Sequence, residues 1–217
     1  MENNLFILSE QRSVANQYLF ELRDATRQKD RMRFRRNLER LGEIMAYEIS
    51  KRLSYQSKKV KTPLAEMAVD VLEEEPLLIT ILRAGLPFHQ GFLRVFDHAD
   101  SGFIGAWRNE DVHDLSVNVD YVSAPSLEGR AVILIDPMLA TGQSVLKAVK
   151  QLLTKGTPSH LFIVSVVSAP EGLQLLQENI PVPYSLWTCA LDENLNSSYY
   201  IVPGLGDAGD LCYGMKD

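Results

Sequence analysis

Cysteine is scarce in this sequence, which contains only Cys189 and Cys212 among its 217 residues. Two thiols are too few for the disulfide framework of a small secreted protein. No apolar run approaches the roughly 20 residues that a membrane-spanning helix needs. The first residues also lack the basic stretch followed by an apolar stretch that marks a signal peptide. We therefore expect a globular protein of the cytoplasm with no membrane partner.

Internal repeats, low-complexity tracts and linkers rich in glycine, serine or proline are absent as well. Nothing in the composition divides the chain, and a length of 217 residues suits one large domain. We expect a single domain over residues 1–217, with a helical region over 1–60, a core over 61–182 and a distinct C-terminal segment over 183–217.

Negative charge dominates the chain but not its N-terminal region. The net charge is −6, yet residues 1–60 hold 13 Lys and Arg against 8 Asp and Glu. Seven of these basic residues cluster between positions 27 and 40. A nucleic-acid surface is one interpretation of such a cluster, but the acidic remainder of the chain would repel a polyanion. We therefore expect a solvated helix face, or one that docks on an acidic partner subunit, and no nucleic-acid partner.

Two kinds of apolar pattern follow each other along the chain. Between residues 13 and 53, apolar side chains recur every three or four positions, which predicts two helices. After Pro63, short apolar runs alternate with helical patterns. The runs predict strands over 77–82, 102–107, 115–122, 131–135, 161–167 and 184–189, and the helical patterns fall over 143–154 and 170–178. This alternation predicts an α/β fold, a mostly parallel sheet flanked by helices, with ligands bound beyond the carboxyl ends of the strands.

Small residues follow the strand predicted over 131–135. The segment consists of Asp136, Pro137, Met138, Leu139, Ala140, Thr141, Gly142, Gln143 and Ser144. Its backbone N–H groups and the start of the next helix favour a phosphate, and Asp136 suits the hydroxyl groups of a ribose. An ordinary strand-to-helix turn capped by Thr141 is the alternative. A nucleoside-triphosphate loop is excluded, because no Gly-Lys-Ser or Gly-Lys-Thr closes the segment.

Two further segments carry candidate binding residues. Arg83 follows the strand predicted over 77–82, and the planar fork of an arginine suits a diphosphate. Residues 200–210 contain three glycines and one proline, so we expect a shaped loop there, neither a helix nor a central strand. The exposed backbone of such a loop can read the edge of a flat base. Uracil offers acceptor, donor and acceptor groups, whereas cytosine places a donor where an acceptor is needed.

Together these segments resemble the uracil phosphoribosyltransferases, a branch of the type I phosphoribosyltransferases. The matching strings are Asp-Pro-Met-Leu-Ala-Thr-Gly at 136–142, Leu-Arg-Ala-Gly-Leu at 82–86 and the glycine-rich string at 200–210. The resemblance implies a glycosyltransferase of pyrimidine salvage, which converts uracil and phosphoribosyl diphosphate (PRPP) to UMP and diphosphate. It also implies that residues 136–144 bind PRPP and that 183–217 form a hood over the base.

The resemblance assigns roles to single residues as well. Arg83 and Arg108 would contact the diphosphate of PRPP, and Asp207 would lie against both PRPP and uracil, so these three are the candidate catalytic residues. The residues implied to contact uracil are Ile201, Gly206, Asp207 and Ala208. Mg²⁺ would arrive bound to PRPP, without a metal site built by the protein. Gln143 departs from the resemblance, because the family usually has a second glycine there.

Other properties of the family are expectations for this chain. We expect a homodimer or homotetramer, with the helical N-terminus and residues 111–123 as candidate contact surfaces, and a GTP effector stays open. Two other functions compete with catalysis on uracil. A nucleotide-sensing module without turnover is disfavoured by the intact arginines and the C-terminal segment. A type I enzyme for a purine or orotate is disfavoured by the single acidic residue, Asp136, at the start of the phosphate loop.

Overall fold

A mostly parallel sheet forms the centre of the molecule. The computed structural model describes residues 4–108 and 117–215, including all side chains in these ranges except those of 107, 108 and 117–119. The strands are ordered β1-β10-β9-β7-β4-β5-β6 across the sheet. Their bounds are Leu5–Ile7 for β1, Leu77–Leu82 for β4, Ser101–Arg108 for β5, Val117–Ser123 for β6, Ala131–Ile135 for β7, His160–Ser168 for β9 and Tyr184–Leu191 for β10. Neighbours in this order run parallel, except that β5 and β6 are antiparallel.

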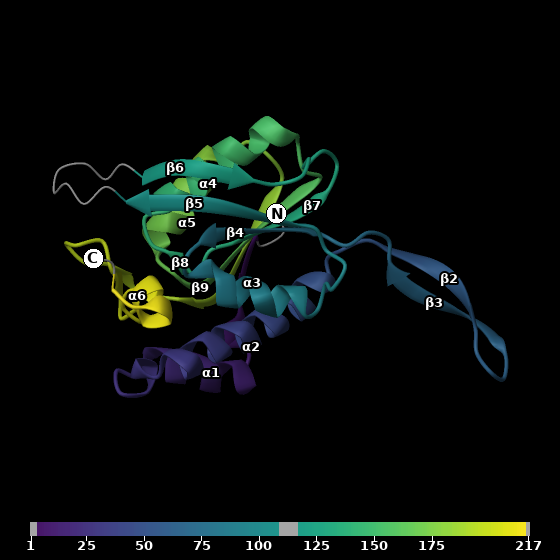
Figure 1. Ribbon diagram of the computed structural model, residues 1–217, viewed down its shortest axis with the longest axis horizontal. Helices are drawn as coiled ribbons and strands as arrows, with labels where there is room; N and C mark the ends of the chain where they lie inside the picture. Colours follow the sequence, from purple (N-terminus) through teal and green to yellow (C-terminus); the bar gives the residue numbers. More distant parts are fainter. Residues whose placement is uncertain (1–3, 109–116, 216–217) are drawn as a thin grey trace.

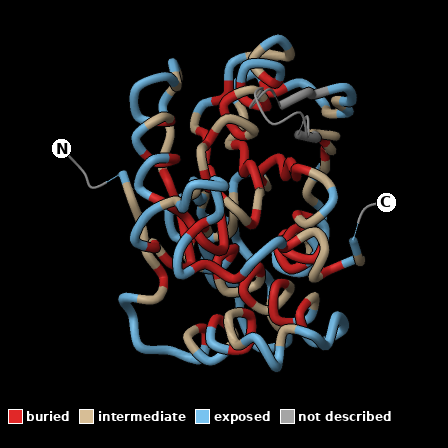
Figure 2. Tube along the Cα trace, turned by 90° about the vertical axis from the view of Figure 1, so that its left-hand side faces the viewer, coloured by how far each residue is buried: buried red, intermediate tan, exposed pale blue. Residues whose placement is uncertain are grey.

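Helices cover both faces of this sheet (Figure 1). One face carries α1 (Val14–Arg23), α2 (Arg31–Ser50) and α3 (Gly85–Leu93), and the other carries α4 (Gln143–Leu152) and α5 (Pro170–Asn179). Within β4, Leu78 packs toward α2 and α3, while Leu77 and Ile79 pack toward α4. Buried segments, red in Figure 2, therefore run through the middle of the molecule. Burial on both faces explains the near-continuous apolar runs of the central strands.

The predicted α/β class is confirmed, and so are the two N-terminal helices. α2 begins after Asp30, whose side chain accepts a hydrogen bond from the backbone N–H of Arg33 at 3.0 Å. Short 3-10 turns lie next to the helices at Leu8–Glu10, Arg27–Lys29 and Leu153–Lys155. The strand predicted over 115–122 begins at Val117 in the structure, and residues 109–116 lie outside the described residues.

The region over 1–60 is not entirely helical, contrary to expectation. β1 is an edge strand that runs parallel to β10. After α2, β2 (Tyr55–Lys61) and β3 (Glu66–Leu72) form an antiparallel hairpin that projects far from the body of the molecule (Figure 1). This hairpin also crosses the predicted boundary at residue 61. The sequence patterns did not reveal it because both faces of the hairpin are largely exposed and carry charged residues.

The C-terminal segment leaves the sheet later than the boundary at residue 183 suggests, because β10 lies in the main sheet between β1 and β9. Beyond β10, β11 (Asn194–Leu195) and β12 (Ile201–Val202) pair antiparallel, and β8 (Met138–Leu139) pairs with β9. The prediction that 200–210 contain no helix is wrong at one end, since α6 spans Ala208–Tyr213. Among the described residues, no helix is long and apolar enough to cross a membrane.

Candidate active site

The predicted binding residues converge at one edge of the sheet because their strands are neighbours. β4 lies between β7 and β5, and all three run parallel. Arg83 follows β4, Asp136 follows β7, and Arg108 is the last residue of β5. The carboxyl ends of the three strands therefore meet at the same edge. The side chain of Arg108 lies outside the described part of the chain.

The first half of the phosphate loop is fastened to β9. The backbone N–H of Asp136 donates to the carbonyl of Val164 at 3.0 Å. The carbonyl of Pro137 accepts from the N–H groups of Val166 and Val167 at 3.0 and 3.1 Å. Within the loop, an oxygen of Asp136 accepts from the N–H of Met138 at 3.3 Å. These contacts fix the place where the loop leaves the sheet.

The second half of the loop rests against the start of α5. Gly142 adopts a left-handed conformation (φ +79°) directly before α4 begins at Gln143. A Cβ atom at Gly142 would lie 3.0 Å from the carbonyl oxygen of Gly172, and one at Gly172 would collide with the carbonyl oxygen of Ala140. The loop and α5 thus pack backbone against backbone. The N-terminus of α4, ten residues long, offers its partial positive charge at the end of this loop.

The turn after β4 packs against the end of β7. Gly85 opens α3, and a Cβ atom there would collide with Oγ1 of Thr80 and lie 3.3 Å from the carbonyl oxygen of Ile135. Oγ1 of Thr80 in turn donates to that carbonyl at 3.3 Å. A residue without a side chain at position 85 therefore lets the turn that carries Arg83 approach the strand that carries Asp136. This contact brings the two predicted binding loops together.

The side chain of Arg83 reaches the C-terminal segment. Its Nη2 lies 3.7 Å from Oδ1 of Asp210 and donates to the carbonyl of Gly214 at 3.4 Å. A Cβ atom at Gly209 would lie 3.1 Å from Oδ1 of Asp207 and 3.7 Å from Nη2 of Arg83, so both groups flank the same glycine. The structure thus places Arg83 and Asp207, two of the three candidate catalytic residues, close together.

The segment predicted to contact a base is tightly folded. Ile201 and Ala208 are buried, whereas Gly206 and Asp207 are exposed. Asp207 is the N-cap of α6, because its Oδ1 accepts from the N–H of Asp210 at 2.9 Å. Gly206 has a positive φ of +91°, a conformation that favours glycine. The exposed backbone between these buried residues is available to a ligand.

Both cysteine thiols and the imidazole of His89 are buried. Burial raises the pKa of the Cys212 thiol to about 12, and it raises the pKa of Cys189 further. Burial lowers the pKa of His89 to about 4, and Nε2 of this ring lies 3.1 Å from the hydroxyl of Ser101. Among the described residues, no group of three His, Cys, Asp or Glu side chains is placed to hold a metal ion. His113 lies outside the described residues.

Comparison with known proteins identifies the family of this chain. A family model of uracil phosphoribosyltransferase matches residues 9–215. The uracil phosphoribosyltransferase of Porphyromonas gingivalis is 45% identical over 210 residues, which are 96% of this chain and 97% of that protein. The chain belongs to the uracil phosphoribosyltransferase family. The enzyme of the same name from Pyrococcus furiosus is 37% identical over 199 residues, covering 90% of this chain and 84% of the relative.

One solved structure has the same fold as this chain over nearly its whole length. The structure of the AQ2163 protein from Aquifex aeolicus has a TM-score of 0.86 and 33% identity, and the match covers 97% of this chain and 98% of that one.

Sequence reasoning missed two supporting residues of the candidate site, Gly172 and Asp210. The sequence offers a signal for Gly172, because Pro170 marks the start of a helix directly after a strand and so places a glycine in the first turn of that helix. The contact of Asp210 with Arg83 carries no local signal, because the two residues are far apart in the sequence.

Proposed function

We propose that this chain transfers the phosphoribosyl group of PRPP to uracil and releases UMP and diphosphate. The observation that carries the proposal is the convergence at one sheet edge of Arg83, the loop at 136–144 and the C-terminal segment. The guanidinium of Arg83, the backbone N–H groups of the loop and the exposed backbone of the C-terminal segment lie at one region, which suits a diphosphate, a phosphate and a base. Family membership supports the same reaction.

Each part of PRPP has a binding group in this proposal. The 5′-phosphate binds the loop residues 140–144 and the start of α4, where amides and hydroxyl groups favour an anion. Asp136 accepts hydrogen bonds from the ribose hydroxyls. Arg83 and Arg108 bind the diphosphate, and Mg²⁺ enters as part of the substrate and offsets more of its charge.

The transfer exchanges one bond at the anomeric carbon for another. The bond from this carbon to the diphosphate oxygen breaks, the bond to N1 of uracil forms, and the proton of N1 is released. Bond breaking runs ahead of bond making, so positive charge develops on the ribose. Asp207, which lies beside Arg83, orients this centre, and positioning and electrostatics supply the catalysis without a covalent nucleophile.

Base selection rests on the backbone of the C-terminal segment. Ile201, Gly206, Asp207 and Ala208 surround the base, with N–H groups meeting its carbonyl oxygens and a carbonyl meeting its ring N–H. Cytosine would leave a buried donor facing another donor, which costs about 1–3 kcal/mol per unpaired group. Orotate would bring an additional carboxylate beside Asp207.

We also propose that the protein is a homo-oligomer that uses the β2–β3 hairpin. An isolated two-stranded hairpin is only marginally stable in water, and this one exposes Val60, Leu64 and Met67 by 43%, 97% and 53%. A second copy that covers these side chains would stabilise both hairpins. Analytical ultracentrifugation of the full chain and of a Val60→Lys/Met67→Lys variant tests this, and a variant as oligomeric as the unchanged protein would contradict it.

The reaction is tested by incubating the purified protein with PRPP, Mg²⁺ and one base at a time, followed by chromatography. We expect UMP and diphosphate with uracil and no product with cytosine, orotate or hypoxanthine. Parallel reactions with GTP decide whether it activates. A protein that binds PRPP but converts no base would refute the enzyme and favour the nucleotide-sensing module. The location in the cytoplasm stays a prediction.

Asp207→Asn tests the catalytic assignment with the fold preserved. Asparagine keeps the carbonyl oxygen that caps α6 through the N–H of Asp210, but it removes the negative charge. We expect kcat to fall at least about 100-fold, as for other groups that act on the transition state, with an unchanged melting temperature. Asp97→Asn is the matched control, because the Asp97 side chain is 75% exposed and lies outside both the site and the hairpin, and it should retain full activity. Full turnover by Asp207→Asn would contradict the role.

A further inference from the structure

The C-terminal base-contacting segment is held in place by the N-terminal helices. Arg23, the last residue of α1, forms a two-pronged ion pair with Asp192, which directly follows β10. Nη2 of Arg23 lies 2.6 Å from Oδ1 of Asp192, and Nη1 lies 2.9 Å from Oδ2. The Asp192 side chain is only 5% exposed. Planar pairing of this kind fixes both side chains in one orientation.

The same ion pair holds both backbone polar groups of Gly204. Nη1 of Arg23 donates to the carbonyl of Gly204 at 3.0 Å, and the N–H of Gly204 donates to Oδ2 of Asp192 at 2.8 Å. One residue later, the carbonyl of Leu205 accepts from Nε2 of Gln28 at 3.2 Å. We name this set, Arg23, Gln28 and Asp192, the clamp. It fixes two consecutive residues immediately before Gly206 and Asp207.

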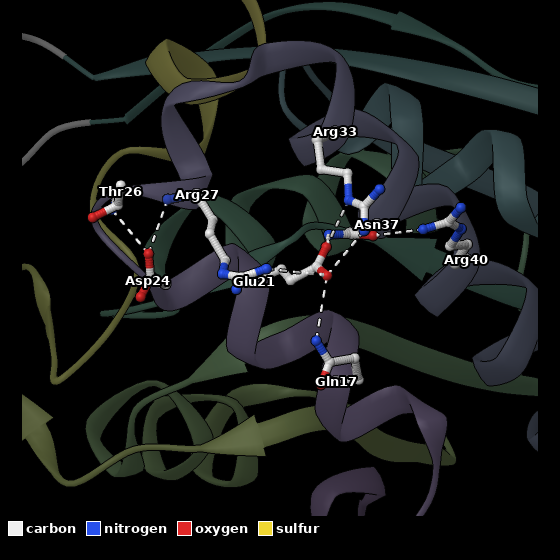
Figure 3. A network of polar contacts seen from close by, with 8 residues as sticks. All are labelled: Gln17, Glu21, Asp24, Thr26, Arg27, Arg33, Asn37 and Arg40. Atoms are coloured by element: carbon white, nitrogen blue, oxygen red, sulfur yellow. Dashed lines mark hydrogen bonds and ion pairs between the residues drawn. The ribbon is translucent and has the colours of Figure 1, made fainter.

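Helix α1, which carries Arg23, is itself joined to α2 by a polar network around the buried side chain of Glu21 (Figure 3). Glu21 of α1, two residues before Arg23, accepts from Nε of Arg33 and Nδ2 of Asn37, each at 2.8 Å. Both donors lie on α2, so the network joins the two helices. Arg35 of α2 adds a hydrogen bond from Nη1 to the carbonyl of Cys212 at 2.6 Å, which holds the end of α6.

The basic cluster between residues 27 and 40 is therefore not only a solvated face, as the sequence suggests. Arg33 and Arg35 are engaged inside the chain, and the second of them contacts the C-terminal segment. The segment has little structure of its own to hold its shape, because β12 has two residues and α6 has six. Elements this short depend on tertiary contacts.

We propose that Arg23 and Asp192 are positioning residues for uracil, which set the shape of the base-contacting backbone from outside the site. This inference rests on the proposed function, because it assumes that residues 206–208 contact the base. Hydrogen bonds to a base edge need accurate placement, and a shift of about 1 Å far from the reacting atoms can cost 100-fold in rate. The phosphate loop and Arg83 are held by the sheet instead, so PRPP binding does not require the clamp.

Steady-state kinetics of Arg23→Met separates positioning from stability. We expect the KM for uracil to rise at least tenfold while the KM for PRPP stays within twofold. Arg23→Lys, which keeps the charge but loses the planar fork, should give an intermediate KM for uracil. Arg94→Met is the matched control, because Arg94 also joins two elements through two carboxylates, Glu39 and Glu43, outside the site. Its KM for uracil should not change.

A purely structural role predicts a different result. A less stable enzyme with an intact site loses active molecules, so kcat and the melting temperature fall while the KM for uracil stays constant. That outcome would overturn the proposal. If Arg23→Met does not fold, Gln28→Ala keeps the Arg23–Asp192 ion pair. It removes the hydrogen bond to Leu205 together with those to the carbonyls of Leu22 and Arg23. It should raise the KM for uracil by a smaller factor, and an unchanged KM would likewise overturn the proposal.

Hydrogen exchange of the backbone amides gives a readout independent of activity. Peptides covering 200–210 should exchange faster in Arg23→Met than in the unchanged protein, while peptides covering 136–144 should not. If the unchanged protein makes no UMP, the proposed function fails, and the exchange experiment still decides whether the clamp orders the segment. Equal exchange in both proteins would refute the clamp even where the enzyme is active.

Discussion

Replacing Glu21 by Gln should destabilise the protein measurably, because this carboxylate is the centre of the network between α1 and α2. Its side chain is 6% exposed. It accepts two hydrogen bonds from Arg33, at 2.8 and 3.0 Å, one from Asn37 at 2.8 Å and one from Gln17 at 3.3 Å. Glutamine retains one acceptor oxygen but turns the other into an NH₂ donor that faces these donors. Figure 3 shows how they converge on the one carboxylate.

The size of the effect follows from the pKa of Glu21. Hydrogen bonds from Arg33 and then Asn37 lower this pKa from 4.5 to about 2. A shift of that size corresponds to roughly 3 kcal/mol of free energy of unfolding. Because Arg33 is half-exposed and solvent screens its charge, we expect Glu21→Gln to cost about 2 kcal/mol at pH 7.

The pH dependence of this cost has a definite sign. A lowered carboxyl pKa contributes stability that is complete above pH 4.5 and is lost as the pH falls toward 2. The difference in unfolding free energy between the unchanged protein and Glu21→Gln should therefore be constant above pH 5 and shrink below about 4.5. Urea unfolding between pH 7 and pH 3 measures this difference.

A control variant separates the network from ordinary surface charge. Glu48 lies on α2, the helix that carries Arg33 and Asn37, and pairs with Lys51, which is 50% exposed, at 2.8 Å. Glu48→Gln should cost less than about 0.5 kcal/mol, as exposed helical pairs do. The reasoning is refuted if Glu21→Gln costs no more than this control, or if its cost does not decrease on acidification.

Two further changes test other parts of the molecule. Gly172→Ala drives a Cβ atom into the carbonyl of Ala140 in the phosphate loop. The KM for PRPP should therefore rise about tenfold, with little change in the KM for uracil. The same KM for PRPP in the variant and the unchanged protein would show that α5 does not support the PRPP site. His89→Gln removes an imidazole whose pKa burial lowers from 6.5 to about 4. As the pH falls, the unfolded chain protonates this imidazole at a higher pH than the folded chain does. The unfolding free energy of the unchanged protein should therefore fall by on the order of 2 kcal/mol between pH 6.5 and 4. Urea unfolding should show a smaller fall in His89→Gln, and an equal fall in both proteins would exclude His89 as the cause.

The sheet could be predicted from the sequence because burial on both faces leaves a strong pattern. β4 and β7 begin and end at the predicted residues, 77–82 and 131–135. The hairpin over 55–72 left no such pattern, since neither of its faces is buried in the chain. Apolar periodicity reports which side chains the chain itself covers. It does not report strands that project away from the core.

The candidate site was predictable in its parts but not in its connections. Asp136 and Arg83 could be placed because each follows a recognisable strand, and parallel neighbours bring strand ends together. The start of α6 was missed because glycines masked it, although Asp207 followed by Asp210 is a sequence pattern that suits a helix N-terminus. The clamp could not be predicted, because Arg23 and Asp192 are 169 residues apart and pair through tertiary structure alone.

The two proposed binding regions therefore depend on different supports. The loops proposed to bind PRPP take their shape from the main sheet, whose strand β9 holds Asp136 and Pro137 through backbone hydrogen bonds. The segment proposed to contact the base takes its shape from side chains of the N-terminal region. Arg83 connects the two parts, since it follows β4 and contacts Asp210 and the carbonyl of Gly214. These contacts lie at and after α6, whereas the clamp holds Gly204 and Leu205. The supports of the two proposed binding regions are therefore separate, and this is why loss of the clamp should change the KM for uracil and not that for PRPP.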